Sequence, residues 1–265
     1  MSHDLALRTL AATATIREAG RLARRHFERR GELEVELKGM QDMVSLADRG
    51  VEDLIRARLG EAFPEDALVG EEGGGEDAAP GTGQWVIDPI DGTMNFLRGV
   101  PYWSVVIAYV RDREVLIGTT YDPVHDDLYV AAKGQGAFRN GEPIRVSGES
   151  DPHRAVLGHT FNFKLEVGRY VRTLGNLLEA GVDHRRLGST ALMMCHVADG
   201  RLDGCVTLRC SSWDVIAGLR LVEEAGGHAS DWFEAAGSLT APGAVLGCTP
   251  ALADVIRRAS GLEQA

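Results

Sequence analysis

Two carboxylates lie three positions apart in the segment Ile87-Asp-Pro-Ile-Asp-Gly-Thr93. The proline between Asp88 and Asp91 fixes its own backbone angle φ and has no N–H to donate. Because Mg²⁺ prefers oxygen ligands and keeps several waters, two close carboxylates can bind one ion jointly or bridge two ions beside a phosphate. Gly92 allows close backbone approach to a ligand, and Thr93 can begin a helix whose free amides face phosphate oxygens.

The same segment also has the composition of a simple turn, since Asp, Pro and Gly each favour chain reversal. Its flanks, however, are strongly apolar: residues 85–87 read Trp-Val-Ile, and residues 94–97 read Met-Asn-Phe-Leu. Carboxylates carried into an apolar core need a partner. Metal ions would satisfy them, so the setting favours a metal site.

Two further acidic elements precede this segment. Gly70-Glu71-Glu72 follows the apolar residues 67–69, at the expected end of a strand, where binding residues often gather. Taken alone, it is better explained as an exposed, solvated loop. Asp42 and Asp48 flank an expected helix start, where capping and the helix macrodipole explain acidic residues without catalysis.

A last acidic element, Trp213-Asp214-Val-Ile-Ala-Gly218, opens another expected helix. Capping of the helix N-terminus explains Asp214 as well as metal binding does. The combination of the four elements is more informative than any one of them.

Composition limits the classes of function. The 265 residues are 44% hydrophobic and 25% charged, enough for a substantial core in one large domain or two closely packed halves. A formal net charge of -11 disfavours nucleic acid as a partner and suits bound cations. No basic leader or membrane-length apolar run is present, so we expect a soluble, cytoplasmic protein. The four cysteines lack Cys-x-x-Cys spacing and are expected to be reduced, buried thiols without zinc.

Hydrophobic periodicity predicts the elements of the N-terminal half. Apolar residues at three- and four-residue steps predict a long helix over residues 4–29. A strand is expected at residues 33–37, and a second helix after Ser45, which can cap it, with Pro64 helping to end it. The Gly- and Pro-rich residues 70–83 are expected to be irregular. Further strands are predicted at residues 84–88, 103–110, 115–121, 128–131 and 137–146, the last turning at Asn140-Gly141.

Beyond a boundary near residues 147–152, helical and apolar segments alternate. Helices are predicted at residues 165–180, 190–198 and 215–225, with short strands between them and one near Val245. The chain is therefore expected to be α/β (α+β). Its N-terminal half, residues 1–147, carries most of the acidic elements, and its C-terminal half, residues 148–265, carries Asp214 and the residues that would set specificity.

Taken together, these elements resemble the inositol monophosphatase family in order and approximate spacing. The matching motifs are Asp42-x-Val-Ser-x-x-Asp48, Gly70-Glu-Glu72, the segment 85–96, Gly188-Ser189 with residues 197–203, and Trp213-Asp-x-x-Ala-Gly218. The resemblance spans nearly the whole chain. It implies the layered αβαβα sandwich of the inositol monophosphatase and fructose-1,6-bisphosphatase type, a homodimer, sensitivity to lithium, and a site with two or three Mg²⁺ ions.

The resemblance also implies a set of metal ligands. Glu71 and Asp88 would bind a first ion with the carbonyl of Ile90. Asp88, Asp91 and Asp214 would bind a second ion, and Glu71 would help to hold a third.

The remaining site residues are implied in the same way. Asp48 and Thr93 would orient or activate water, and with Glu71 they form the expected catalytic set. The amides of Gly92 and Thr93 would bind the phosphate. The expected substrate-binding residues are Asp91, Gly92, Thr93, Thr190, Thr207, Arg209 and Asp214.

Some positions depart from the family pattern. Thr207 stands where members that act on inositol phosphate have a glutamate that binds sugar hydroxyls, and Met94 replaces a small polar residue or lysine. Arg209 can bind a carboxylate or phosphate bidentately, although a surface salt bridge is the commoner role. Lys38 is a further candidate for contact with the phosphate. Inositol specificity is therefore not implied.

The sequence therefore predicts an enzyme that hydrolyses a small phosphate monoester with metal-activated water. The expected substrates resemble inositol 1-phosphate or are sugar or polyol phosphates. The alternative among enzymes is a histidinol-phosphate or nucleotide 3′-phosphate phosphatase. The alternative of another class is a regulatory binding protein on a phosphatase fold, acting through a protein or RNA partner.

Overall fold

The computed structural model describes residues 2–32, 35–39 and 42–262, and the side chains of residues 2–31 and 46–262. The side chains of Lys38, Asp42 and Ser45, to which the sequence assigns possible roles, lie outside this part. Among the described residues, none of the helices is long and apolar enough to cross a membrane.

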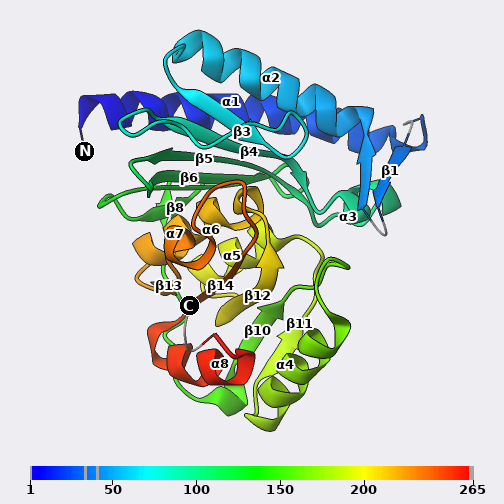
Figure 1. Cartoon of the computed structure of the whole chain (residues 1–265), viewed down its shortest axis with the longest axis vertical. Coiled ribbons are helices and arrows are strands. Elements are labelled where there is room, and N and C mark those ends of the chain that lie inside the picture. Colours follow the sequence, from blue (N-terminus) through cyan, green and yellow to red (C-terminus); the bar gives the residue numbers. More distant parts are fainter. Residues whose placement is uncertain (1, 33–34, 40–41, 263–265) are drawn as a thin grey trace.

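Helices and sheets alternate in five layers (Figure 1). Helices α1 (His3–Glu28) and α2 (Leu46–Ala62) cover one face of a seven-stranded sheet. Helices α5 (Thr190–Ala198) and α6 (Ser212–Glu224) lie between this sheet and a five-stranded one, which α4 (Val167–Glu179) and α8 (Ala253–Ser260) cover on its outer side. The predicted αβαβα sandwich is confirmed.

The strands divide between the two sheets according to their position in the chain. The seven-stranded sheet has the order β3 (Ala67–Gly70), β4 (Gln84–Asp91), β5 (Ser104–Arg111), β6 (Glu114–Asp122), β7 (Asp127–Ala132), β8 (Ala137–Arg139) and β9 (Glu142–Pro143). The five-stranded sheet has the order β11 (Asp183–Arg185), β10 (Val156–His159), β12 (Gly204–Cys210), β14 (Gly243–Cys248) and β13 (His228–Ala229). The remaining elements are α3 (Thr93–Arg98), α7 (Trp232–Ala236), the antiparallel pair β1 (Val35–Gly39) and β2 (Asp42–Ser45), and three short 3₁₀ turns, Arg30–Glu32, Pro152–Arg154 and Pro250–Leu252.

Most of the predicted elements are confirmed, and one strand is wrong in length. Asn140 and Gly141 both have positive φ, 51° and 85°, as the tight hairpin turn requires. The strand predicted over residues 137–146 nevertheless ends at Pro143. The chain then turns toward the end of α6, where the Val146 N–H donates to the Ala225 carbonyl instead of to a neighbouring strand.

The largest of three hydrophobic clusters joins the two halves of the chain. It combines Val106 of β5 with Met194 of α5 and Ile216 of α6, all buried. The predicted boundary at 147/148 falls between β9, which ends at Pro143, and β10, which begins at Val156. The division of the chain into two halves at this boundary stays a prediction. All four cysteines are free and buried.

Two glycines let helix α6 pack closely, one against the large sheet and one against α5. A Cβ atom at Gly118 of β6 would overlap the backbone carbonyl of Ala217, and a Cβ at Gly218 would overlap Met194 of α5. This close packing fixes the first turn of α6, which carries Asp214, relative to the strands of the sheet.

We expect Gly118→Ala to lower the free energy of unfolding by about 1–3 kcal/mol, since α6 must shift to accommodate the methyl group. Gly60→Ala is a matched control, because Gly60 lies inside α2 with no heavy atom within 4 Å of an added Cβ. It should raise the free energy of unfolding by about 0.5–1 kcal/mol. Urea denaturation measures both changes, and equal effects of the two substitutions would contradict the packing described here.

Candidate active site

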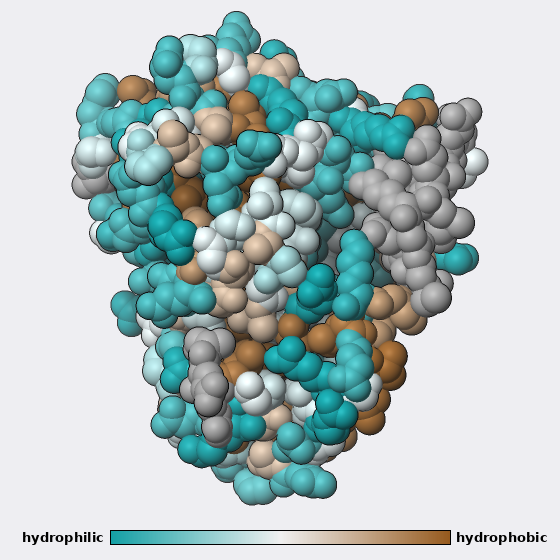
Figure 2. All heavy atoms as spheres, in the orientation of Figure 1, coloured by the Kyte–Doolittle hydropathy of each residue, from teal (hydrophilic) through white to brown (hydrophobic). Residues whose placement is uncertain are grey.

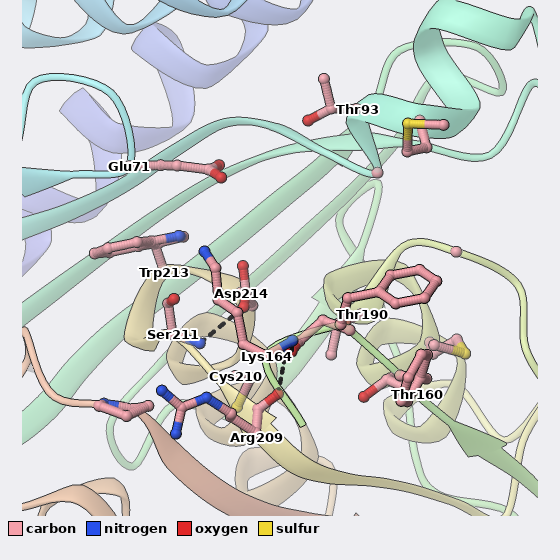
Figure 3. Close-up of a pocket in the computed structure, with 18 of the residues that line it drawn as sticks. Glu71, Thr93, Thr160, Lys164, Thr190, Arg209, Cys210, Ser211, Trp213 and Asp214 are labelled. Carbon is pink, nitrogen blue, oxygen red and sulfur yellow. Dashed lines mark hydrogen bonds between the residues drawn. The ribbon is translucent and has the colours of Figure 1, made fainter. Parts of the chain in front are cut away.

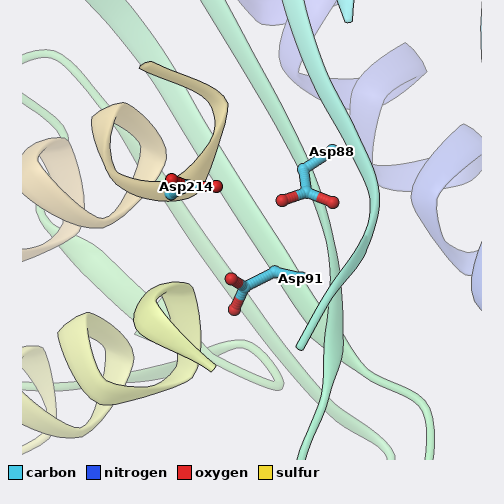
Figure 4. A group of neighbouring side chains, drawn as sticks. All are labelled: Asp88, Asp91 and Asp214. Atoms are coloured by element: carbon cyan, nitrogen blue, oxygen red, sulfur yellow. The ribbon is translucent and has the colours of Figure 1, made fainter. Parts of the chain in front are cut away.

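Asp88 and Asp91 both belong to β4, and a bulge turns them toward the same place. Residues three apart in a regular strand face opposite sides of a sheet. Here Asp88 pairs with Val106 and Asp91 with Ser104, so three steps along β4 match two along β5. The extra residue bends the strand. Asp88 Oδ1 accepts the Ile90 N–H at 3.0 Å within this bend, and the two carboxylates converge (Figure 4).

Asp214 reaches the same place from the first turn of α6 (Figure 4). The carboxylates of Asp88, Asp91 and Asp214 each offer an oxygen atom, and these oxygens all lie within 4.8 Å of one another. The Ser211 N–H donates to Asp214 Oδ2 at 2.9 Å, so the capping role expected from the sequence is confirmed. Capping and convergence with the other two carboxylates are therefore compatible functions of one side chain.

The start of α5 holds the Asp91 carboxylate. The Ser189 hydroxyl donates to it, as do the backbone N–H groups of Thr190 at 3.3 Å and Ala191 at 3.0 Å. The sequence placed Ser189 in a family motif without assigning it a contact. A serine directly before a helix is a typical N-cap, and Ser189 also accepts the Leu192 N–H.

Asn95, another residue to which the sequence assigned no role, connects two parts of the site. Its Nδ2 donates to the carbonyls of Tyr102 and Leu187, both at 2.8 Å. This ties the segment after α3 to the loop that leads into Ser189, so the amides that hold Asp91 are kept in place.

Burial and mutual repulsion favour protons on these carboxylates. Asp88 and Asp91 are only 1% and 7% exposed. Burial raises the pKa of Asp88 well above its ordinary value, and the nearby charges of Glu71, Asp91, Asp214 and Asp48 raise it further. Burial and then Asp214 raise the pKa of Asp91 to about 7, although the hydrogen bonds from α5 act in the opposite direction.

Such a set of groups fits a divalent cation. Buried like charges are costly unless a cation or protons neutralise them. Three converging carboxylates offer the hard oxygen ligands that Mg²⁺ binds. The residues present therefore suit a metal ion of this class.

Glu71 lies in the loop that follows β3, and a buried glutamate of α2 shapes this loop. Glu52 accepts the N–H groups of Glu72 and Gly73, each at 2.8 Å. Arg56 donates a hydrogen bond from Nε to the Glu52 carboxylate at 2.6 Å and one from Nη2 to the Gly74 carbonyl at 2.7 Å. The sequence did not single out Glu52, because its partners lie about twenty residues away. The available signal was its position on the buried face of α2.

A cavity of about 830 Å³ opens beside the carboxylates. Figure 3 shows Glu71 and Thr93 on one wall, Arg209 on the opposite wall and Asp214 between them in this view. Of the residues predicted from the sequence, those that line the cavity are Glu71, Gly92, Thr93, Thr190, Arg209 and Asp214.

The other predicted residues lie behind the cavity wall. Asp48 is buried in α2, close enough to raise the pKa of Asp88. The Ile90 carbonyl accepts the Thr93 hydroxyl at 3.1 Å. Thr207 is fully buried, and its hydroxyl donates to the Arg209 carbonyl at 3.3 Å. The structure therefore does not bring Thr207 to the cavity.

Comparison with known proteins agrees with this geometry. A sequence model described as "Inositol monophosphatase family" matches residues 4–261. The chain is 40% identical to an inositol-1-monophosphatase of Mesorhizobium japonicum over 81% of each chain. It is 36% identical to the Nus factor SuhB of Pasteurella multocida, over 83% of this chain and 84% of that protein. The extragenic suppressor protein suhB of Bartonella henselae superposes with a TM-score of 0.85 at 31% identity, covering 94% of this chain and 96% of that one.

The fold is that of the inositol monophosphatase class of proteins, and its three converging carboxylates could hold a metal ion. The chain belongs to the inositol monophosphatase family.

We expect Glu52→Gln to weaken Mg²⁺ binding by about tenfold, because the loop that carries Glu71 loses an ionised acceptor. Glu61→Gln is the matched control, since Glu61 is an exposed residue of the same helix. Isothermal titration with Mg²⁺ measures both affinities. An unchanged affinity in Glu52→Gln would show that the loop holds its shape without this carboxylate.

Mg²⁺ should stabilise the protein more at pH 8 than at pH 6. A carboxyl group whose folded pKa is raised stabilises the fold while it is protonated, and this contribution is lost as the pH rises toward the folded value, about 7 for Asp91. Mg²⁺ binds the ionised form and so competes with the protons. Thermal denaturation with Mg²⁺ or EDTA at both pH values measures the difference. Asp91→Asn should reduce it, and an equal Mg²⁺ response at the two pH values would count against proton competition.

Proposed function

We propose that this protein hydrolyses small phosphate monoesters with two or three Mg²⁺ ions. The observation that carries the proposal is the convergence of Asp88, Asp91 and Asp214 from two distant elements beside the cavity. Glu71 lies at the same cavity, and membership of the inositol monophosphatase family supports the assignment.

Glu71, Asp88, Asp91, Asp214 and the Ile90 carbonyl would hold the ions. When bound, Mg²⁺ lowers the pKa of a coordinated water and offsets the charge of the phosphate. The chain itself supplies the positions. Asp91 is oriented by the start of α5, Asp214 by Ser211, and Glu71 by the loop that Glu52 shapes.

Thr93 and Asp48 are proposed to orient the attacking water. The Thr93 hydroxyl now donates to the Ile90 carbonyl, which places it at the cavity beside the carboxylates. Gly92 precedes it with φ of 94°, and an added Cβ would lie 3.2 Å from the carbonyls of Gly188 and Tyr102. The Gly92 and Thr93 amides are the proposed phosphate donors, and a side chain at position 92 would crowd them.

Several substrates are compatible with this cavity. Similarity to an inositol-1-monophosphatase supports inositol 1-phosphate or a related sugar or polyol phosphate. The buried Thr207, in place of a glutamate that contacts sugar hydroxyls, removes one reason to expect inositol. Histidinol phosphate and nucleotide 3′-phosphates are the alternatives among enzymes.

A regulatory binding role is the alternative of another class. It is supported by similarity to proteins named Nus factor SuhB, which share 34–36% identity with this chain. The net charge of -11 argues against direct contact with RNA, so a protein partner is the better form of this alternative.

A homodimer and a cytoplasmic location are further parts of the proposal. Three exposed apolar residues, Val167, Val171 and Leu178, follow one side of α4 at helical spacing, and apolar side chains gather over this region in Figure 2. Light scattering of the purified chain would report a single-chain mass if the dimer is absent.

Four free cysteines fit a reducing compartment.

The purified protein should release phosphate from a panel of monoesters with Mg²⁺ and lose this activity with EDTA. Asp88→Asn should lower kcat/KM about 100-fold or more while the circular dichroism spectrum is unchanged, because several kcal/mol of charge stabilisation are lost. Asp53→Asn is the matched control at an exposed position of α2. Absence of turnover on the whole panel, or full turnover by Asp88→Asn, would contradict the proposal.

A further inference from the structure

Arg209 owes its direction to a bulge in β12. Thr207 pairs with Val245 and Cys210 pairs with Gly243, so three steps along β12 match two along β14. All residues of β12 except Arg209 are buried, whereas Arg209 is exposed and lines the cavity. Bulges re-aim side chains in this way beside active sites.

The backbone at the bulge is held from two sides. The Arg209 carbonyl accepts Asn162 Nδ2 at 2.8 Å and the Thr207 hydroxyl at 3.3 Å. Thr207 thus supports the segment that presents Arg209 and does not itself contact the cavity. The substitution that removes the expected sugar-binding glutamate therefore contributes to positioning an arginine.

A second arginine comes to the same cavity by the topology of the sheet. Strands β11 and β12 both run parallel to β10 between them, so their carboxyl ends meet at one edge. Arg186 follows the end of β11, and Arg209 lies near the end of β12. Both are exposed and line the cavity, and neither side chain has an ion-pair partner among the residues that the structure describes.

The proposed metal site and the phosphate that is cleaved do not require these two arginines. Two Mg²⁺ ions would offset the four carboxylates of Glu71, Asp88, Asp91 and Asp214, and the amides of Gly92 and Thr93 suit the phosphate that is cleaved. In a chain of net charge -11, two cavity-lining arginines without an ion-pair partner among the described residues then favour another anion. Guanidinium groups bind carboxylate and phosphate with strong, often bidentate hydrogen bonds.

We propose that Arg209, supported by Arg186, forms a subsite for a second anionic group. The preferred substrates are then phosphate monoesters whose alcohol portion carries a carboxylate or a second phosphate. An alcohol portion that carries an amine, as in histidinol phosphate, is disfavoured. This inference rests on the proposed phosphatase function, and Arg209 acts on the choice of substrate.

Matched substrate pairs test the subsite. 2-Phosphoglycerate differs from glycerol 2-phosphate by a carboxylate in place of a hydroxymethyl group, and fructose 1,6-bisphosphate differs from fructose 1-phosphate by a second phosphate. For the wild-type protein we expect kcat/KM to be about ten- to a hundredfold higher for the doubly anionic member of at least one pair, the effect of one or two hydrogen bonds to a charged group. The pair that shows the preference identifies the second anion as carboxylate or phosphate.

Variants assign the preference to residues. Arg209→Gln should bring the ratio of kcat/KM values in that pair close to one, and Arg209→Lys should keep part of it. Thr207→Val removes the buried hydroxyl without changing the side-chain size and should lower the ratio, whereas Thr207→Ser should retain it. Arg185→Gln is the matched control, since Arg185 is exposed, pairs with Asp183 and does not line the cavity.

The outcomes separate the two proposals. Turnover without a preference in either pair, or a preference that survives Arg209→Gln, overturns the subsite and leaves the phosphatase proposal standing. Efficient hydrolysis of histidinol phosphate, above both doubly anionic esters, also overturns the subsite. Absence of Mg²⁺-dependent turnover on every ester overturns both.

Discussion

The crowding of carboxylates at the end of β4 is the constraint on which the rest of the site depends. Asp88 and Asp91 are buried within reach of Asp214, and each would be more stable protonated or exposed to water. A fold keeps such an arrangement only when surrounding packing enforces it. Gly118 lets α6 approach the sheet, and the start of α5 supplies donors to Asp91. The arrangement is therefore built from both halves of the chain.

Two β-bulges, one in β4 and one in β12, each change the direction in which side chains point beside the cavity. The bulge in β4 turns Asp88 and Asp91 to one side, and the bulge in β12 turns Arg209 outward from a buried strand. A regular strand alternates its side chains between two faces, so neither placement is possible without an extra residue. Departures from regular strand geometry thus coincide with the residues that are proposed to act on substrate.

How much of this site the sequence predicts depends on how far apart in the chain the interacting residues lie. Motifs in a single segment, such as the one around Asp88 and the cap of α6, are local, and both were identified. The contacts of Glu52 and Asn95 were not, because each joins segments that only the folded chain brings together. Thr207 was expected at the cavity by analogy. Its burial in β12 could not be predicted, because the bulge depends on the pairing of β12 with β14.

The two ends of the cavity are also under different constraints. Neighbouring carboxylates raise the pKa values of Asp88 and Asp91, so substitution of one alters the charge balance of the cluster. Arg186 follows β11 and Arg209 lies near the end of β12 in the other sheet, and both side chains are exposed. Their replacement would leave the carboxylate cluster and its packing in place. The proposed subsite can therefore vary at this edge while the carboxylate cluster is preserved, which is consistent with one fold serving relatives that carry different functional names.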